Sequence, residues 1–210
     1  MQITYLFDPL CGWCYGAAPA IGRLGSAPGL DVVLAPTGLF SGENARIMEP
    51  GFAEYAWQND QRIARLTGQV FSERYRRNVL DATGTMFDSA PATLGLVAVG
   101  LTQPEAERDA LRALQTARYV DGRDNGQLAV VAAVLAEAGF DAAAARLAAP
   151  DDALLHACRE RVDQGRRLMA EFGLNGVPAV IADGGGTRRV IPSSALFGDA
   201  GQLLAALTAA

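Results

Sequence analysis

Two cysteines three positions apart, Cys11 and Cys14, are the residues of this chain best suited to chemistry. A thiolate attacks disulfides, and a second thiol nearby can then attack the mixed disulfide held on the first. Three residues make about one helical turn, so in a helix both sulfurs lie on the same face. The pattern Cys11-Gly12-Trp13-Cys14 therefore predicts thiol-disulfide exchange, with Cys11 as the nucleophile and Cys14 as the resolving thiol.

The segments around this motif predict a strand followed by a helix. Gln2–Phe7 mixes β-branched, aromatic and aliphatic residues, which favours a short buried strand. Asp8 and Pro9 end it, because proline donates no ladder hydrogen bond and disfavours helix just before it; Asp8 either tunes the thiol or simply ends the strand. Cys11 is then expected at the N-terminus of the next helix, where unpaired N–H groups favour a thiolate. Since Gly12 and Trp13 add no titratable group, we expect a reductase or isomerase and not a strong oxidant.

A zinc site is the main competing interpretation of the two cysteines. His156 and Cys158 complete a set of four side chains of acceptable type. They are two residues apart in a predicted helix, however, about 200° around its axis, so they cannot converge on one metal. Cys158 falls in an apolar stripe that includes Leu155 and Val162, which indicates a small buried side chain. No metal is expected, and His156 is expected at the surface.

The rest of the chain predicts an α/β protein with a long helical block. Residues 29–36 form a second strand, parallel to the first through a right-handed crossover. From about Ala45 to Phe172 strand patterns vanish, and after Gly173 they return. The expected later elements are helices at Pro50–Thr67, Phe71–Leu80, Pro91–Leu101, Thr102–Val120, from Asp124, Asp141–Ala148 and up to Phe172, then strands at Gly176–Ala182 and Thr187–Ile191 and a helix at Asp199–Leu207.

Composition and charge argue against a nucleic-acid-binding or membrane protein. The 210 residues carry a net charge of −5, with 18 basic residues that are all arginine, and no basic stretch suits nucleic acid or an anionic membrane. Met1 leads directly into the first strand without a signal-like segment, and no apolar run approaches the ~20 residues of a membrane span. These features predict a cytoplasmic protein. In a reducing compartment such a cysteine pair is catalytic or metal-binding more often than structural.

The motif and its surroundings resemble the thioredoxin fold, in particular the DsbA-like branch with an inserted helical domain. Phe7–Gly16 is similar to the bacterial DsbA-family, FrnE-like predicted disulfide isomerases. Gly176–Ala182 resembles the later strand of the thioredoxin fold, which begins at a Val-Pro pair. The resemblance implies a β-α-β … β-β-α fold with an all-helical insertion. Residues 1–44 and 173–210 would form the thioredoxin-like domain, and residues 45–172 the inserted helical domain with its long connecting helix.

The resemblance also implies a substrate site. Pro178 would be a cis-proline across from Cys11, and the backbone of Val177 would pair with an extended peptide as in strand addition. Trp13 would line the same groove, although apolar residues at such spacing more often belong to the core. No cofactor is expected beyond the redox-active disulfide, with glutathione as a candidate co-substrate. The partners would be disulfide-containing proteins or small thiols and a thiol reductant.

Two other functions use the same architecture. Kappa-class glutathione transferases and hydroxychromene-carboxylate isomerases resemble it, but they typically carry serine where Cys11 stands, so the complete motif argues against them. A non-catalytic peptide-binding or chaperone module would hold clients between the helical block and the sheet. Conjugation of glutathione that survives Cys14→Ser would favour the transferase. Client binding that survives loss of both cysteines would favour the chaperone.

Overall fold

A four-stranded sheet with strand order β2-β1-β5-β6 forms the centre of the molecule in the computed structural model, which describes residues 1–198 and 200–208. β1 pairs in parallel with β2 and antiparallel with β5, and β5 pairs antiparallel with β6. The fold is the expected thioredoxin-like one. The strands of this sheet are β1 (Gln2–Phe7), β2 (Asp31–Pro36), β5 (Ala179–Gly184) and β6 (Thr187–Ile191).

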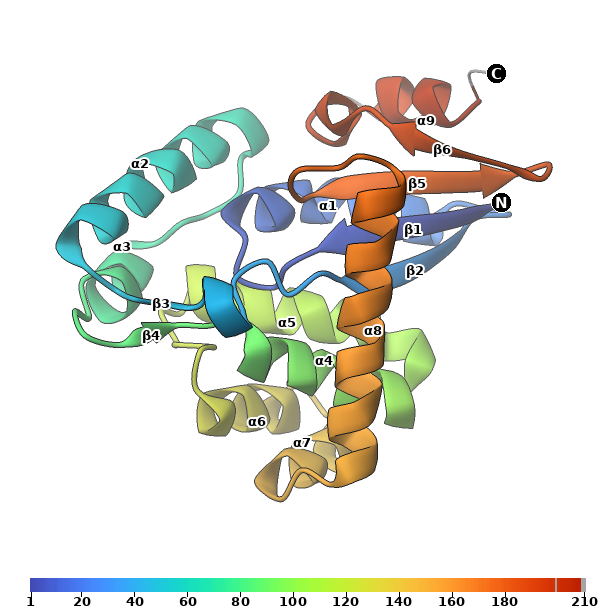
Figure 1. Ribbon diagram of the computed structural model, residues 1–210. Helices are drawn as coiled ribbons and strands as arrows, with labels where there is room; N and C mark the ends of the chain where they lie inside the picture. Colours follow the sequence, from blue (N-terminus) through green and yellow to red (C-terminus); the bar gives the residue numbers. More distant parts are fainter. Residues whose placement is uncertain (199, 209–210) are drawn as a thin grey trace.

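Helices cover the sheet and fill the long segment between β2 and β5 (Figure 1). In Figure 1 the long helix α8 runs beside β2 and returns the chain from the helical part to β5. The helices are α1 (Gly12–Ser26), α2 (Pro50–Thr67), α3 (Glu73–Tyr75), a π-helical turn at Arg76–Leu80, α4 (Ala90–Thr102), α5 (Glu107–Tyr119), α6 (Leu128–Glu137), α7 (Asp141–Ala148), α8 (Asp152–Glu171) and α9 (Ala200–Thr208).

The register of the sheet brings the two ends of the candidate site together. Leu6, at the end of β1, pairs with Ala179, at the start of β5. The chain that leaves β1 therefore begins beside the chain that enters β5. The first of these connections carries Cys11, and the second carries Val177 and Pro178. Strand pairing alone thus juxtaposes segments that lie more than 160 residues apart in the sequence.

The helical part packs against α1 and shares its core. The ring of Tyr15 on α1 stacks on that of Tyr119 on α5 with centroids 4.6 Å apart, and the Tyr119 hydroxyl donates to the Leu10 carbonyl at 2.8 Å. On the other side, Gly165 of α8 lies directly on the Pro36 carbonyl of β2, where a Cβ would overlap backbone. None of the helices in the described ranges has the length and apolar character needed to cross a bilayer.

Several sequence predictions were wrong in detail. The segment after Asp124 begins with a turn in which Asp124 Oδ1 accepts from the Gly126 N–H at 3.0 Å, so α6 starts only at Leu128. The helical block contains a two-residue ladder, β3 (Arg46–Ile47) with β4 (Met86–Phe87), too short to give an alternating pattern.

Three other predictions differ from the structure: two concern element boundaries, and one concerns which leucine of α8 is buried. The helix expected over residues 71–80 is divided into α3 and the π-helical turn. The apolar stripe predicted for α8 included Leu155, but in the structure Leu154 is the fully buried leucine and Leu155 is only partly buried. β5 begins at Ala179, after the proline. Asp199, the expected start of the last helix, lies outside the described residues.

Candidate active site

Cys11 is the N-cap residue of α1. Its backbone is extended (φ −82°, ψ 117°), and the helix starts at Gly12. The turn before it is closed by the Cys11 N–H, which donates to the Asp8 carbonyl at 3.1 Å, and by the Leu10 N–H, which donates to Asp8 Oδ1 at 2.9 Å. Cys11 therefore stands at the N-terminus of α1, where the unpaired N–H groups of the first helical turn favour a negative charge.

The Cys11 thiol faces the start of β5. Cys11 Sγ donates to the Val177 carbonyl over 3.7 Å, and the Val177–Pro178 peptide bond is cis. Pro178 is buried, whereas Val177 is half-buried. The structure therefore brings Cys11, Val177 and Pro178 together in the arrangement that the family resemblance implies.

An aromatic cavity of about 310 Å³ opens beside Cys11. Trp13 is half-buried at its wall, where its ring meets Phe197 edge-on at 5.3 Å. Cys11 is 6% exposed and lines this cavity. The lining residues from the helical part are Arg46, Phe52, Tyr55, Ala56, Asn59, Asp60, Ile63, Tyr75, Phe87 and Tyr119.

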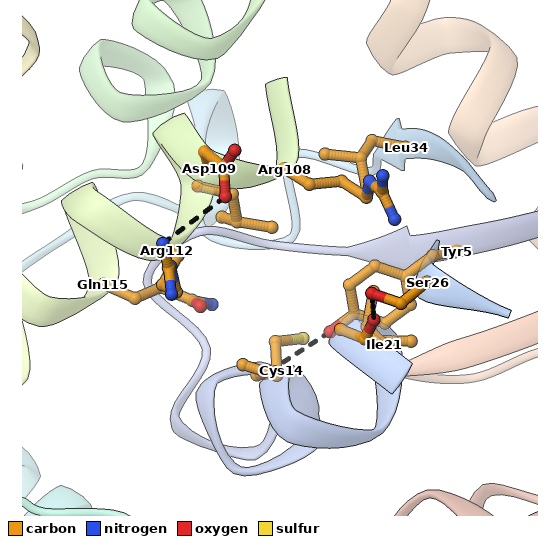
Figure 2. Close-up of a pocket in the computed structure, with 12 residues that line it drawn as sticks. Tyr5, Cys14, Ile21, Ser26, Leu34, Arg108, Asp109, Arg112 and Gln115 are labelled. Carbon is orange, nitrogen blue, oxygen red and sulfur yellow. Dashed lines mark hydrogen bonds and ion pairs between the residues drawn. The ribbon is translucent and has the colours of Figure 1, made fainter. Parts of the chain in front are cut away.

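Cys14 has no exposed surface. Figure 2 shows its side chain at the floor of a second cavity, of about 340 Å³, between α1 and α5. Tyr5 donates from its hydroxyl to the Cys14 carbonyl at 3.2 Å, and Gln115 of α5 lines the same space. Burial, followed by the hydrogen bond and charge of Cys11, raises the pKa of the Cys14 thiol well above its ordinary value. Both cysteines are free thiols in this structure.

Asp8 is fully buried beneath the motif. Its carboxylate accepts hydrogen bonds from the Leu10 N–H at 2.9 Å, the Phe40 N–H at 3.1 Å and the Ser89 hydroxyl at 2.7 Å. Burial raises its pKa, while these donors and Arg118 oppose that rise. Asp8 therefore does more than end the strand, because it ties the Cys11 turn to the loop after β2 and to the start of α4.

Sequence reasoning missed a second buried carboxylate, Asp60 of α2. It is 5% exposed, and its Oδ2 accepts from the Tyr75 hydroxyl at 2.9 Å. Burial raises its pKa to about 7, against lowering contributions from the Tyr75 hydrogen bond and from Arg118. The signal was its spacing: Asp60 follows Ala53 by seven residues and precedes Ile63 by three, which places it on the buried face of the helix.

Arg118 lies under the aromatic wall of the Cys11 cavity. It is 1% exposed, with its guanidinium 5.5 Å from the Tyr75 ring centroid and 5.3 Å from that of Phe87. Its nearest carboxylate oxygen is Asp124 Oδ1, at 3.5 Å from Nη1. Burial lowers the pKa of this group, but Tyr75, Tyr119 and nearby carboxylates outweigh burial and raise it, so Arg118 is a buried positive charge.

The remaining candidates lie elsewhere. Cys158 is half-buried and lines a separate cavity with Thr93 and Leu94, and His156 is exposed on α8. The described residues contain no group of three or more potential metal ligands.

Comparison with solved structures gives close matches over nearly the whole chain. The cytosolic disulfide reductase DsbM from Pseudomonas aeruginosa is 33% identical, with a TM-score of 0.81 over 92% of this chain and 90% of that one. A second structure of DsbM, with glutathione (GSH), is 31% identical, with a TM-score of 0.78 and 92% and 91% coverage.

The fold extends to an enzyme of another class. A 2-hydroxychromene-2-carboxylate isomerase has a TM-score of 0.58 at 20% identity, over 94% of this chain and 91% of that one, a likeness that shows the fold alone. A comparison with curated protein sequences gave no match. The family model for a DSBA-like thioredoxin domain matches residues 2–202. The chain therefore belongs to the family of DSBA-like thioredoxin-domain proteins, the thiol-disulfide oxidoreductases of DsbA type.

Proposed function

We propose that this protein is a thiol-disulfide oxidoreductase of the reductase or isomerase type, with Cys11 and Cys14 as its redox pair. The observation that carries the proposal is the position of Cys11. Cys11 is the N-cap residue of α1 and lines an aromatic cavity, and its Sγ lies 3.7 Å from the Val177 carbonyl oxygen beside the cis-proline. A helix N-terminus that faces a peptide edge suits a thiolate that attacks a polypeptide disulfide.

The exchange runs in two balanced steps. The Cys11 thiolate attacks one sulfur of a substrate disulfide, so a Cys11–substrate disulfide forms and the other substrate sulfur leaves as a thiolate that takes a proton from solvent. Cys14 then loses its proton and attacks Cys11 Sγ, which releases the second substrate thiol and forms the Cys11–Cys14 disulfide. The substrate gains two electrons and two protons, and the pair loses them.

The burial of Cys14 supports this division of roles. A fully buried thiol whose pKa is raised stays protonated and cannot compete for substrates in solution. Once Cys11 carries a mixed disulfide, its sulfur is within reach of Cys14, which lies one turn further along α1.

Val177, Pro178 and Trp13 would bind the substrate. The chain entering β5 offers the peptide groups of Val177 to an extended segment, and the half-buried Trp13 ring forms the wall of the cavity next to Cys11. A disulfide held along this edge would place one sulfur against Cys11.

We further propose that the pair works in the cytoplasm and is reset by a thiol such as glutathione. Two equivalents of a monothiol return the Cys11–Cys14 disulfide to two thiols and leave as one disulfide. The similarity to DsbM, which is described as cytosolic and has been solved with glutathione, supports this direction of electron flow. No resident cofactor is needed for either half of the cycle.

The test is reduction of insulin disulfides with glutathione as the electron source. The wild type should be active, Cys11→Ser should lose the activity, and Cys14→Ser should lose most of it. Cys158→Ser is the matched control and should keep full activity, because Cys158 lines a different cavity. Equal rates in all four proteins would contradict the proposal. Glutathione conjugation that survives Cys14→Ser would instead identify a transferase.

A further inference from the structure

The carboxylate of Asp60 lies against the first residue of α1. A Cβ built on Gly12 would overlap Asp60 Oδ1, and it would lie 3.3 Å from Ile63 Cδ1. Gly12 directly follows Cys11, and the first turn of α1 has no acidic residue of its own. The helical part therefore supplies, from α2, a carboxylate at the same helix terminus that favours the Cys11 thiolate.

The two oxygens of this carboxylate have different environments. Oδ2 accepts the hydrogen bond from Tyr75, and the Oδ1 side faces Gly12 in the wall of the cavity that also contains Cys11. No other hydrogen bond to Asp60 is found among the described residues. Its position is thus fixed from α3, while its charge is directed at the terminus of α1. The titratable and charged groups around Asp60 are Cys11, Arg46, Tyr55, Tyr75, Arg118 and Tyr119.

We propose that Asp60 makes the Cys11–Cys14 pair a stronger electron donor, as a positioned charge that acts through Cys11. This inference rests on the function proposed above. In the reduced pair a Cys11 thiolate and the Asp60 carboxylate repel one another across the helix terminus. The disulfide form carries no charge and feels no such repulsion. The carboxylate therefore destabilises the reduced pair relative to the oxidised pair, which favours transfer of electrons to a substrate.

The effect depends on pH. The pKa of Asp60 is about 7, so the carboxyl is mostly neutral at pH 6 and mostly ionised at pH 8. Arg118, the buried cation of this network, keeps its charge throughout this range and lowers the Asp60 pKa. The reduced Cys11–Cys14 pair should therefore become a stronger electron donor as the pH rises from 6 to 8. This increase should exceed the ordinary pH dependence of the redox potential that any cysteine pair shows.

The test is the equilibrium of the cysteine pair with glutathione buffers at pH 6 and pH 8, in wild type, Asp60→Asn and the control Asp141→Asn on α7. At pH 8 Asp60→Asn should shift the equilibrium about tenfold toward the reduced pair, the order expected of two nearby unit charges. Tenfold corresponds to about 30 mV for this two-electron couple. At pH 6 Asp60→Asn should agree with wild type within about twofold, and Asp141→Asn should match wild type at both values.

Two results would overturn the inference: no shift at pH 8, or an equal shift at both pH values, which is what a purely structural role would give.

Tyr75→Phe provides a second variant if Asp60→Asn does not fold. Tyr75→Phe removes the hydrogen bond that lowers the Asp60 pKa, so Asp60 should ionise at a higher pH than in wild type. The additional increase in the electron-donor strength of the cysteine pair should then begin at a higher pH. An equilibrium with glutathione that depends on pH as in wild type would contradict the inference. Failure of the pair to form a disulfide in wild type would contradict the proposed function instead.

Discussion

Cys11 and Cys14 share one helical turn but have opposite surroundings. The Cys11 thiol borders an open cavity, whereas Cys14 is enclosed between α1 and α5. Their spacing predicted that they share one helix face, because three residues make about one turn, and the structure places both at the start of α1. Asp60 could not be assigned a role in this way. Its approach to Gly12 depends on how α2 packs against α1, and no local pattern encodes that packing.

Removal of the resolving thiol should turn Cys11 into a covalent trap for substrates. Cys14→Ser should react with glutathione disulfide or with an oxidised protein and accumulate a mixed disulfide on Cys11, because the thiol that resolves it is gone. Cys11→Ser should accumulate none, since Cys14 is buried and protonated. Intact-mass spectrometry after acid quenching measures both adducts. A stable adduct on Cys14 in Cys11→Ser would reverse the assigned roles.

Asp60 should also affect stability in a pH-dependent way. Its folded-state pKa of about 7 lies above the value of about 3.9 expected when unfolded. Between these values the folded state binds more protons, so this group lowers the free energy of unfolding as the pH rises. Relative to Asp60→Asn, wild type should lose about 2–3 kcal/mol between pH 5 and pH 8. Urea unfolding at both pH values measures this difference, and parallel pH profiles would contradict it.

At the scale of elements, the sequence predicted most helices and strands within a few residues. Pro50–Thr67 and Thr187–Ile191 match the observed bounds of α2 and β6, because strong periodicity and clear end signals coincide there. The β3–β4 ladder and the late start of α6 were missed. Two-residue strands carry no periodicity, and the Asp124 turn resembles a helix cap in sequence.

The junction of α1 and α2 gives an element-scale prediction. Gly12→Ala should destabilise the protein by about 1–3 kcal/mol, because the new methyl group displaces a buried carboxylate that Tyr75 holds in place. Gly22→Ala on the same helix is the matched control. Nothing lies within 4 Å of its Cβ position, so it should stabilise by about 0.5–1 kcal/mol. Thermal or urea unfolding of the two variants measures the change in the free energy of unfolding. Equal changes in Gly12→Ala and Gly22→Ala would contradict the packing of Asp60 against Gly12.

At the scale of the molecule, the site depends on how the helical part meets the sheet. Cys11, Val177 and Pro178 come from the connections next to the sheet, whereas Asp60, Tyr75 and Arg118 come from the helical block. The family resemblance predicted the first group and the order of the elements. The second group lies in the helical block, where no local motif marked these three residues in the sequence, so their contribution appears only in the packed structure.

Arg161 of α8 joins three elements in this packing. Its Nη2 donates to the Leu34 carbonyl of β2 at 2.7 Å and forms an ion pair with Glu107 Oε1 of α5 at 2.8 Å. Burial raises the pKa of Glu107, and Arg161 opposes that rise. Arg161→Met should therefore cost about 2–3 kcal/mol at pH 8, because Glu107 loses its counter-charge, and less at pH 5, where Glu107 can be protonated.

Exposed Arg167 on the same helix is the matched control for this contact. Arg167→Met should change the free energy of unfolding by less than about 0.5 kcal/mol at either pH. Urea unfolding of both variants measures the difference. If Arg161→Met were no more destabilising than Arg167→Met, the junction would not depend on this contact.

The most direct test of the whole account is the redox potential of the Cys11–Cys14 pair, measured by equilibration with glutathione buffers at pH 7 and mass analysis of the trapped thiols. A reductase or isomerase with this site should form the intramolecular disulfide and have a potential between about −180 and −270 mV. A potential near −120 mV, as in a strong oxidant, or the failure of Cys11 and Cys14 to form a disulfide at all, would contradict it.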